Sequence, residues 1–136
     1  METMTVKSTA HAELIDVTDR IQTLLGDSGI ASGLAMIHVP HTTAAVTINE
    51  NADPTVVHDI LADLERVAPW RQSYYRHAEG NSAAHLKSSM IGCWQTVPIE
   101  KGRLVLGTWQ GIYFCEFDGP RTRRMLVKLI ADAPEG

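Results

Sequence analysis

The feature that most constrains the fold is a series of short β-rich runs that follow one another closely along the chain. Most of them are separated by only a few residues, and such gaps are too short for the helical crossovers that join parallel strands. Strands spaced in this way favour a largely antiparallel sheet. The predicted strands are Gly33–Val39, Ala44–Asn49, Leu86–Gly92, Gln95–Ile99, Leu104–Leu106, Trp109–Phe117 and Arg124–Ile130.

Two segments have the spacing of amphipathic helices. The first follows Asp16, which we predict to be its N-cap, and Gly29 is expected to end it. The second begins with Asp53 as N-cap and Pro54 at the first helical position, where a missing N–H costs little, and Pro69 ends it. Its apolar side chains recur at intervals of three and four residues: Val57, Ile60, Leu61, Leu64 and Val67. Together with the strands, these two main helices predict an α+β domain.

Length and composition limit the fold and the partners of the chain. At 136 residues it is long enough for one domain, which we expect to span residues 1–136, but too short for an eight-fold α/β barrel of about 250 residues. Hydrophobic residues at 44% and charged residues at 21% are typical of a globular protein. The net charge of −4, with one small basic cluster at Arg121, Arg123 and Arg124, argues against a nucleic-acid partner.

The sequence shows no pattern typical of export or membrane insertion. Residues 1–10 lack the apolar run of a signal peptide, and no window approaches the roughly 20 apolar residues of a membrane span. Cys93 and Cys115 are too few and too far apart to indicate a disulfide framework or a CxxC pair. We therefore expect a cytoplasmic protein with no membrane partner, in which both thiols are free and buried.

Histidines give the first indication of chemistry. His41 follows a predicted strand, while His77 and His85 lie in and beside a long polar stretch over residues 71–84, and stretches of this kind are often functional. Neutral imidazole is a common metal ligand and also a general acid or base near neutral pH. Three histidines with an open fourth position would resemble a catalytic zinc site, although the spacing of His77 and His85 matches no standard zinc motif. Hydrogen-bonded or surface histidines are the alternative, and this is how we interpret the others: His11, His38 and His58.

A second group of polar side chains lies between a predicted strand and a predicted helix, in the segment TINENADP (47–54). A helix N-terminus presents free N–H groups and can receive an anion. Glu50 is a candidate general base, or a carboxylate that orients an imidazole. The alternative is purely structural, with Asp53 capping the helix and Asn49 and Asn51 satisfying the backbone of the turn.

Further candidates come from the second half of the chain. Trp109 and Gln110, between two glycines, are candidate pocket residues, although a strand tryptophan often belongs to the core. Lys87 would share a strand face with His85 and is a candidate phosphate contact, or alternatively a solvated lysine. Arg121 is a candidate substrate contact, or the structural partner of an aspartate across a tight turn.

Common nucleotide and hydrolase motifs are absent. The sequence contains neither GxxxxGK[ST] nor GxGxxG, and it has no GxSxG elbow. Nucleotide-dependent phosphoryl transfer is therefore unsupported.

Three long segments, in order, resemble one known family. HTTAAVTINENADP (41–54), HAEGNSAAHLKSSMIG (77–92) and GRLVLGTWQGIYFCEFDGPR (102–121) are similar to the YjbQ-like family of secondary thiamine-phosphate synthases. The resemblance extends from about Met4 to Ala131. It implies a compact α+β domain with a β-sandwich-like sheet core, assembled as a homotrimer.

The resemblance also implies a site of histidines and carboxylates that holds a divalent metal. Its catalytic candidates are Glu50, His77, Glu79 and His85. Its candidate substrate or anion contacts are Thr42, Thr43, Asn49, Asn81, Lys87, Gln110 and Arg121. The candidate metal ligands are His41, His77 and His85, a set that favours zinc or another transition metal, with magnesium as the alternative.

The activity implied by the family joins hydroxymethylpyrimidine diphosphate to thiazole phosphate and releases diphosphate. This chemistry needs positive potential for the departing diphosphate, and an aromatic ring such as Trp109 or Tyr75 to stack on the developing pyrimidine cation. Since magnesium normally assists diphosphate departure, histidine ligands raise the possibility that the synthase reaction is a side activity. The alternatives are a metal-dependent hydrolase of a phosphorylated small molecule and a non-enzymatic metal- or metabolite-binding protein.

Overall fold

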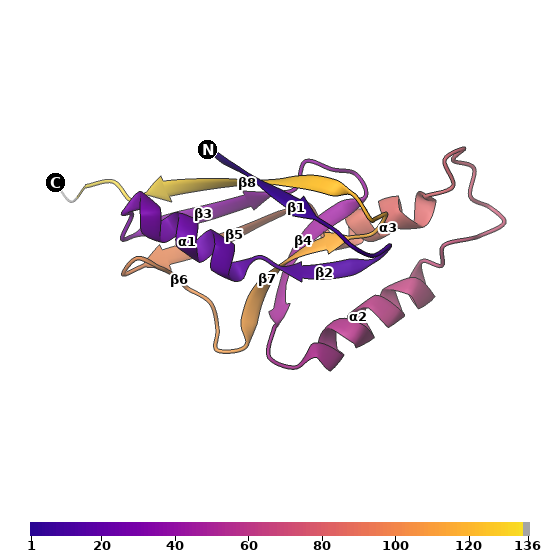
Figure 1. The fold of residues 1–136 in the computed structure, drawn as a ribbon, viewed down its shortest axis with the longest axis horizontal. Coiled ribbons are helices and arrows are strands. Elements are labelled where there is room, and N and C mark those ends of the chain that lie inside the picture. The colour runs from indigo at the N-terminus through magenta and orange to yellow at the C-terminus, as the bar shows by residue number, and fades with distance from the viewer. Residues whose placement is uncertain (135–136) are drawn as a thin grey trace.

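Two antiparallel sheets form the framework of the computed structural model, which describes residues 1–134 (Figure 1). The larger sheet has the order β1-β8-β3-β5-β6 and the smaller one the order β2-β7-β4. The strands are β1 (Glu2–Lys7), β2 (Glu13–Asp16), β3 (Gly33–His38), β4 (Ala44–Glu50), β5 (Trp94–Glu100), β6 (Arg103–Leu104), β7 (Gln110–Glu116) and β8 (Thr122–Ala131). The helices are α1 (Thr18–Ser28), α2 (Pro54–Val67) and α3 (Ser82–Ile91).

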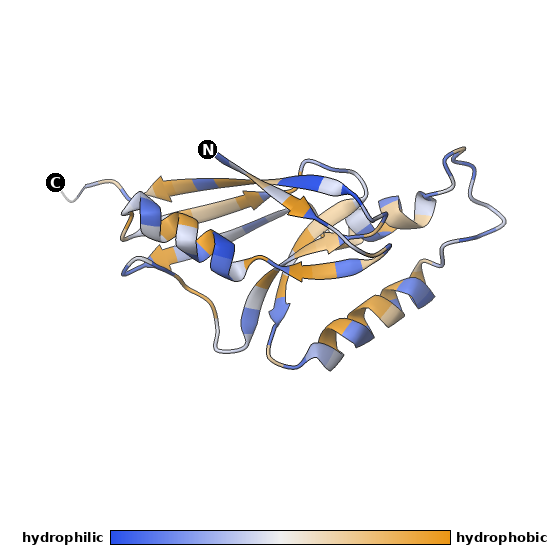
Figure 2. Cartoon of the chain, viewed as in Figure 1, coloured by the Kyte–Doolittle hydropathy of each residue, from blue (hydrophilic) through white to orange (hydrophobic). Residues whose placement is uncertain are grey.

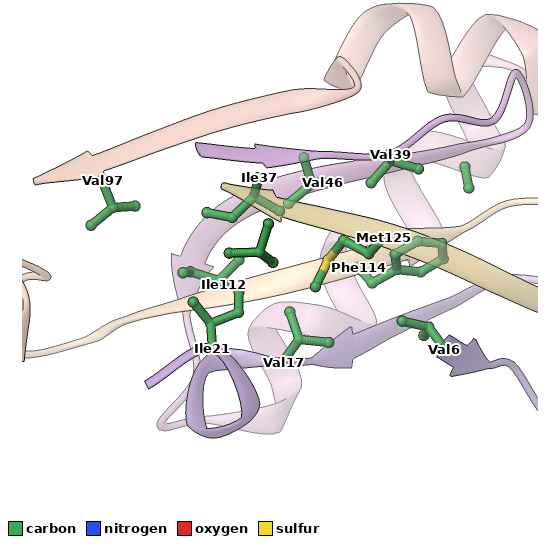
Figure 3. Packing of buried hydrophobic residues seen from close by; sticks show 12 residues of the cluster. Val6, Val17, Ile21, Ile37, Val39, Val46, Val97, Ile112, Phe114 and Met125 are labelled. Carbon is green, nitrogen blue, oxygen red and sulfur yellow. The ribbon is translucent and has the colours of Figure 1, made fainter. Parts of the chain in front are cut away.

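The main core lies between the two sheets and under α1. Phe114 of β7 and Met125 of β8 are fully buried in it, together with Ile37 of β3 and Ile21 of α1 (Figure 3). Alternation along each strand produces this arrangement, because every second side chain points to the same face of a sheet. The expected α+β domain with a sandwich-like, largely antiparallel core is therefore confirmed.

A second core covers the other face of the smaller sheet. Ala45 of β4 and Cys115 of β7 are buried there against α3 and the apolar side of α2. Figure 2 shows this apolar side as the orange stripe along α2. Most of the predicted stripe packs against this cluster, whereas Val67, its last member, is 52% exposed. Because both faces of the smaller sheet are covered, β7 is buried along almost its entire length.

The helix ends follow the predicted caps closely. Asp53 accepts a hydrogen bond from the backbone N–H of Thr55, and α2 ends two residues before Pro69. Gly29 ends α1 in the left-handed conformation (φ 72°), which favours glycine. Asp16 accepts from the N–H of Thr18 although Val17 holds the N-cap position itself.

The prediction of a strand over Leu86–Gly92 is wrong, because these residues belong mainly to helix α3. The side chains that α3 buries are Ala83, Ala84, Lys87 and Ser88. They have the three- and four-residue spacing of a helix, but they are small or polar, so no apolar stripe marks them. The assumption that His85 and Lys87 share a strand face is wrong for the same reason, since residues two apart lie on nearly opposite sides of a helix.

The sequence did not indicate β1 and β2. β1 contains one buried apolar residue, Val6, among polar ones, and β2 has only four residues. Both depend on long-range pairing, β1 with β8 and β2 with β7. Within residues 1–134, no helix is both long and apolar enough to cross a membrane.

Candidate functional site

A cavity of about 670 Å³ opens where the end of β3, the β3–β4 connection and the start of α3 meet. Eight of the twelve predicted site residues line it: His41, Thr42, Thr43, His77, Glu79, Asn81, His85 and Arg121. They come from two of the sequence segments and the end of a third, which the fold brings to one end of the two sheets. We call this cavity the histidine cavity.

Two histidine rings face each other at the N-terminal end of α3. His85 lies in the first turn of the helix and His77 in the connection before it; their ring centroids are 5.4 Å apart, with the rings nearly perpendicular. His77 Nε2 is 3.9 Å from Glu79 Oε1, and the His77 side chain is 44% exposed. The pair is therefore open to a ligand.

His41 is held by the backbone of β8. Its Nε2 lies 3.1 Å from the backbone N of Arg124 and 3.2 Å from the carbonyl oxygen of the same residue. Burial, followed by the nearby charge of Arg123, lowers the pKa of His41 below its ordinary value. The His41 ring is therefore neutral near pH 7, and it contacts the backbone through one nitrogen only.

Arg123, which lines the histidine cavity, belongs to a buried ion pair with Glu116. Arg123 and Glu116 are 5% and 0% exposed, and the Arg123 side chain donates to both carboxylate oxygens of Glu116, at 2.5 to 3.2 Å. Arg123 Nη2 also donates to Thr43 Oγ1 at 2.8 Å, and Ser8 Oγ donates to Glu116 Oε1 at 2.7 Å. This network therefore fixes the side chain of a residue that lines the cavity.

Opposing effects set the ionisation of Glu116. Burial raises its pKa, but hydrogen bonds from Arg123 and Ser8 outweigh burial and leave the pKa below its ordinary value. The carboxylate is therefore ionised at neutral pH, and Arg123 has a permanent counter-charge.

Asn81, just before α3, has an unused acceptor. Its Nδ2 donates to Asp118 Oδ2 at 3.0 Å, and Arg121 donates to the same oxygen at 2.9 Å. The Asp118–Arg121 contact is the structural alternative that the sequence left open for Arg121. Among the described residues, Asn81 Oδ1 is the one buried side-chain nitrogen or oxygen atom without a hydrogen-bond partner.

The remaining predicted site residues lie elsewhere. Lys87 is buried, and its Nζ is 2.6 Å from Glu65 Oε2, so it ties α3 to α2. Glu50 pairs with Gln110 across β4 and β7, at the end of β4 opposite the cavity, which at about 3.3 Å per residue is roughly 20 Å away. Asn49 lies beside them and accepts a hydrogen bond from the N–H of Glu50. Within one chain, the structure does not bring these four residues to the histidines.

Three residues that line the histidine cavity were not among the predicted site residues, although their side chains can form hydrogen bonds: His38, Cys93 and Arg123. His38 and Cys93 line the histidine cavity, and Cys93 is exposed, which corrects the expectation that both thiols are buried. Cys115 is buried as expected, and burial raises the pKa of its thiol to about 12. Strand alternation could have revealed the buried position of Arg123, because Arg123 is in phase with inward-facing Met125 on β8.

The histidines do not form a complete metal site. Over residues 1–134, no three His, Cys, Asp or Glu side chains lie close enough together to hold one ion. His77 and His85 are adjacent, but His41 stands apart with its Nε2 against the backbone of β8. The donor set as arranged therefore does not fit a three-histidine centre.

The fold and the cavity define a class: small α+β sandwich domains with an open pocket lined by histidines and arginine. The chain belongs to the YjbQ-like family, because the profile of the family described as "UPF0047 protein YjbQ-like" matches residues 2–132. This confirms the family resemblance of the three sequence segments.

Relatives from distant organisms share nearly the full length of the chain. The UPF0047 protein YugU of Bacillus subtilis is 54% identical over 130 residues, which cover 96% of this chain and 98% of YugU. A UPF0047 protein of Methanocaldococcus jannaschii is 51% identical, covering 93% of this chain and 91% of its own length.

Solved structures show the same fold. A YjbQ/UPF0047 family protein of Clostridium acetobutylicum has a TM-score of 0.93 and 48% identity, covering 96% of this chain and all of that chain. A Sulfolobus solfataricus protein, described as YbjQ-like and of unknown function, has a TM-score of 0.92 and 33% identity, covering 96% of both chains. The comparisons thus establish the family and leave its activity open.

Proposed function

We propose that this protein is an enzyme acting on phosphorylated small molecules, and that it joins hydroxymethylpyrimidine diphosphate to thiazole phosphate, as its main reaction or a side activity. The observation that carries the proposal is one cavity in which four histidines lie beside Arg121 and Arg123. The family resemblance supplies the particular reaction.

Arg123 supports anion binding because it is already fixed and desolvated. Its hydrogen bonds to Glu116 and Thr43 use Nε and Nη2, and Nη1 has no acceptor among the described residues. A donor held rigidly in place costs little reorganisation when a charged ligand arrives. Because Glu116 neutralises much of the charge of Arg123, we expect histidine N–H groups to supply the remaining donors to a phosphate.

The reaction requires departure of diphosphate rather than removal of a proton. The bond between the pyrimidine methylene carbon and the diphosphate oxygen breaks, and its electron pair leaves with the diphosphate. The lone pair of the thiazole nitrogen then forms the new carbon–nitrogen bond. We expect His77 and His85, which adjoin each other in the cavity, to donate N–H hydrogen bonds to the departing oxygens while Arg123 binds the anion.

A divalent metal at His41, His77 and His85 stays a prediction, with zinc or another transition metal favoured and magnesium as the alternative. When bound there, such an ion would supply Lewis-acid stabilisation of a phosphate oxygen. No step above depends on it, because the three rings do not converge on one point. The homotrimer implied by the family resemblance also stays a prediction.

The experiment that tests the proposal is formation of thiamine phosphate from the two substrates by the purified protein. We expect His77→Ala to lower the rate by about a hundredfold or more, because it removes a group that acts on the departing diphosphate. His58→Ala is the matched control, since the His58 side chain is 78% exposed on α2 and lies outside the cavity. Absence of product with the wild-type protein, or equal rates for both variants, would reject the proposal.

A further inference from the structure

A second cavity, of about 590 Å³, adjoins the histidine cavity. His77 lines both of them, so the two cavities share one wall. The other side chains that matter here are Trp70, Arg71 and Tyr75, from the connection between α2 and α3. In this connection the sequence assigned candidate roles to Tyr75, His77, Glu79 and Asn81. We call this space the aromatic cavity.

The aromatic side chains of this cavity are held in place. The ring of Trp70 packs against the second core and meets the ring of His11 edge-on, with centroids 4.3 Å apart. The backbone N–H of Trp70 donates to Glu65 Oε1 at 2.9 Å, and Glu65 is in turn paired with Lys87 of α3. Tyr75 donates its hydroxyl hydrogen to the carbonyl oxygen of Pro69 at 3.3 Å.

The chemistry of the aromatic cavity differs from that of its neighbour. Two aromatic rings and one guanidinium provide flat surfaces that favour a planar, electron-poor or cationic ring. Of the two residues that the sequence offered for stacking, Tyr75 lines this cavity, while Trp109 immediately precedes β7, near Glu50 and far from the histidines.

We propose that the aromatic cavity, between Trp70 and Tyr75, binds the planar heterocycle of a substrate whose phosphate groups occupy the histidine cavity. His77 then stands where ring and phosphate meet, next to the bond that breaks. The assignment of the ring to a reactant rests on the proposed function, whereas the affinity of the cavity for an aromatic ring rests on its own residues.

The test measures two probes separately by titration calorimetry. One is 4-amino-5-hydroxymethyl-2-methylpyrimidine, which carries the ring without phosphate, and the other is inorganic diphosphate. We expect Tyr75→Ala and Trp70→Leu to weaken binding of the pyrimidine by about tenfold each and to leave diphosphate affinity unchanged. Circular dichroism verifies that both variants fold. If Trp70→Leu disturbs the second core, Tyr75→Ala alone decides the test.

Tyr74→Ala is the matched control. Tyr74 is 69% exposed and meets the ring of Tyr75 edge-on, with ring centroids 5.3 Å apart, but it does not line the cavity. Its replacement should change neither affinity. No binding of the pyrimidine to the wild-type protein, or equal affinity in folded Tyr75→Ala, would overturn the inference even if thiamine phosphate is formed. Tyr75-dependent binding without product formation would support the inference and reject the synthase.

Discussion

At the scale of single residues, the histidine cavity depends on the buried pair formed by Glu116 and Arg123, of which Arg123 lines the cavity. Both side chains are nearly inaccessible, and Ser8 and Thr43 complete their hydrogen bonds. A buried ion pair of this kind contributes little net stability compared with apolar residues of the same size, but removing one partner is costly. The pair instead holds the side chain of Arg123 in a fixed position beside the cavity.

Glu116→Gln should lower the free energy of unfolding at pH 7 by about 3–5 kcal/mol, because it leaves the charge of Arg123 buried without a counter-charge. The pKa of Glu116 is depressed in the folded state, so the carboxylate stabilises the protein above its ordinary pKa of 4.5 and loses this effect as the pH falls further. The stabilities of wild type and variant should therefore converge below about pH 4.5. Chemical denaturation between pH 3 and pH 7 measures this.

The control for this substitution is Asp63→Asn. Asp63 pairs with Arg66 on the surface of α2, where both side chains are about 70% exposed. Exposed pairs contribute at most about 1 kcal/mol. If Glu116→Gln lowered the free energy of unfolding no more than Asp63→Asn does, the buried pair would not be what holds Arg123 in place beside the cavity.

At the scale of elements, α3 determines where the site lies. It presents His85 in its first turn, and Asn81 immediately precedes it. It escaped prediction because its buried side is made of alanine, serine and lysine, whereas the caps and apolar stripe of α2 were evident from the sequence. Residue types at α3 thus selected side chains that line the cavity, but they did not reveal the helix that carries them.

Two roles have been considered for Lys87 of α3, a structural tie to α2 and a direct contact with phosphate. The structure makes it a tie to Glu65 of α2, whereas the family resemblance implied a phosphate contact. We expect Lys87→Met to lower the free energy of unfolding by about 1 kcal/mol and to leave diphosphate affinity unchanged. Parallel thermal unfolding and diphosphate titration measure both quantities. Glu65→Gln should also leave diphosphate affinity unchanged, but it should destabilise the fold more than Lys87→Met does, because it leaves the buried ammonium of Lys87 without its counter-charge. A loss of diphosphate affinity confined to Lys87→Met would instead favour direct contact.

At the scale of the whole molecule, the fold divides the predicted site into two sets. The histidines, Asn81 and Arg121 gather at one end of the sheets, while Glu50 and Gln110 lie at the other end of β4. The spacing of the β-rich runs was enough to predict the antiparallel core, and residue type was enough to identify eight of the residues that line the histidine cavity. The separation of the two sets depends on long-range register between β4 and β7, which local sequence does not specify. In a homotrimer, which stays a prediction, the two sets could meet between neighbouring chains.

Titration calorimetry with inorganic diphosphate tests the central claim, that the histidine cavity is where a phosphorylated substrate binds. The account predicts saturable binding to the wild-type protein and to His58→Ala. The doubly substituted variant with His77→Ala and His85→Ala should bind about tenfold more weakly or worse, because it loses two donors to the anion. Equal affinity in all three proteins, or no binding to any of them, would contradict the account.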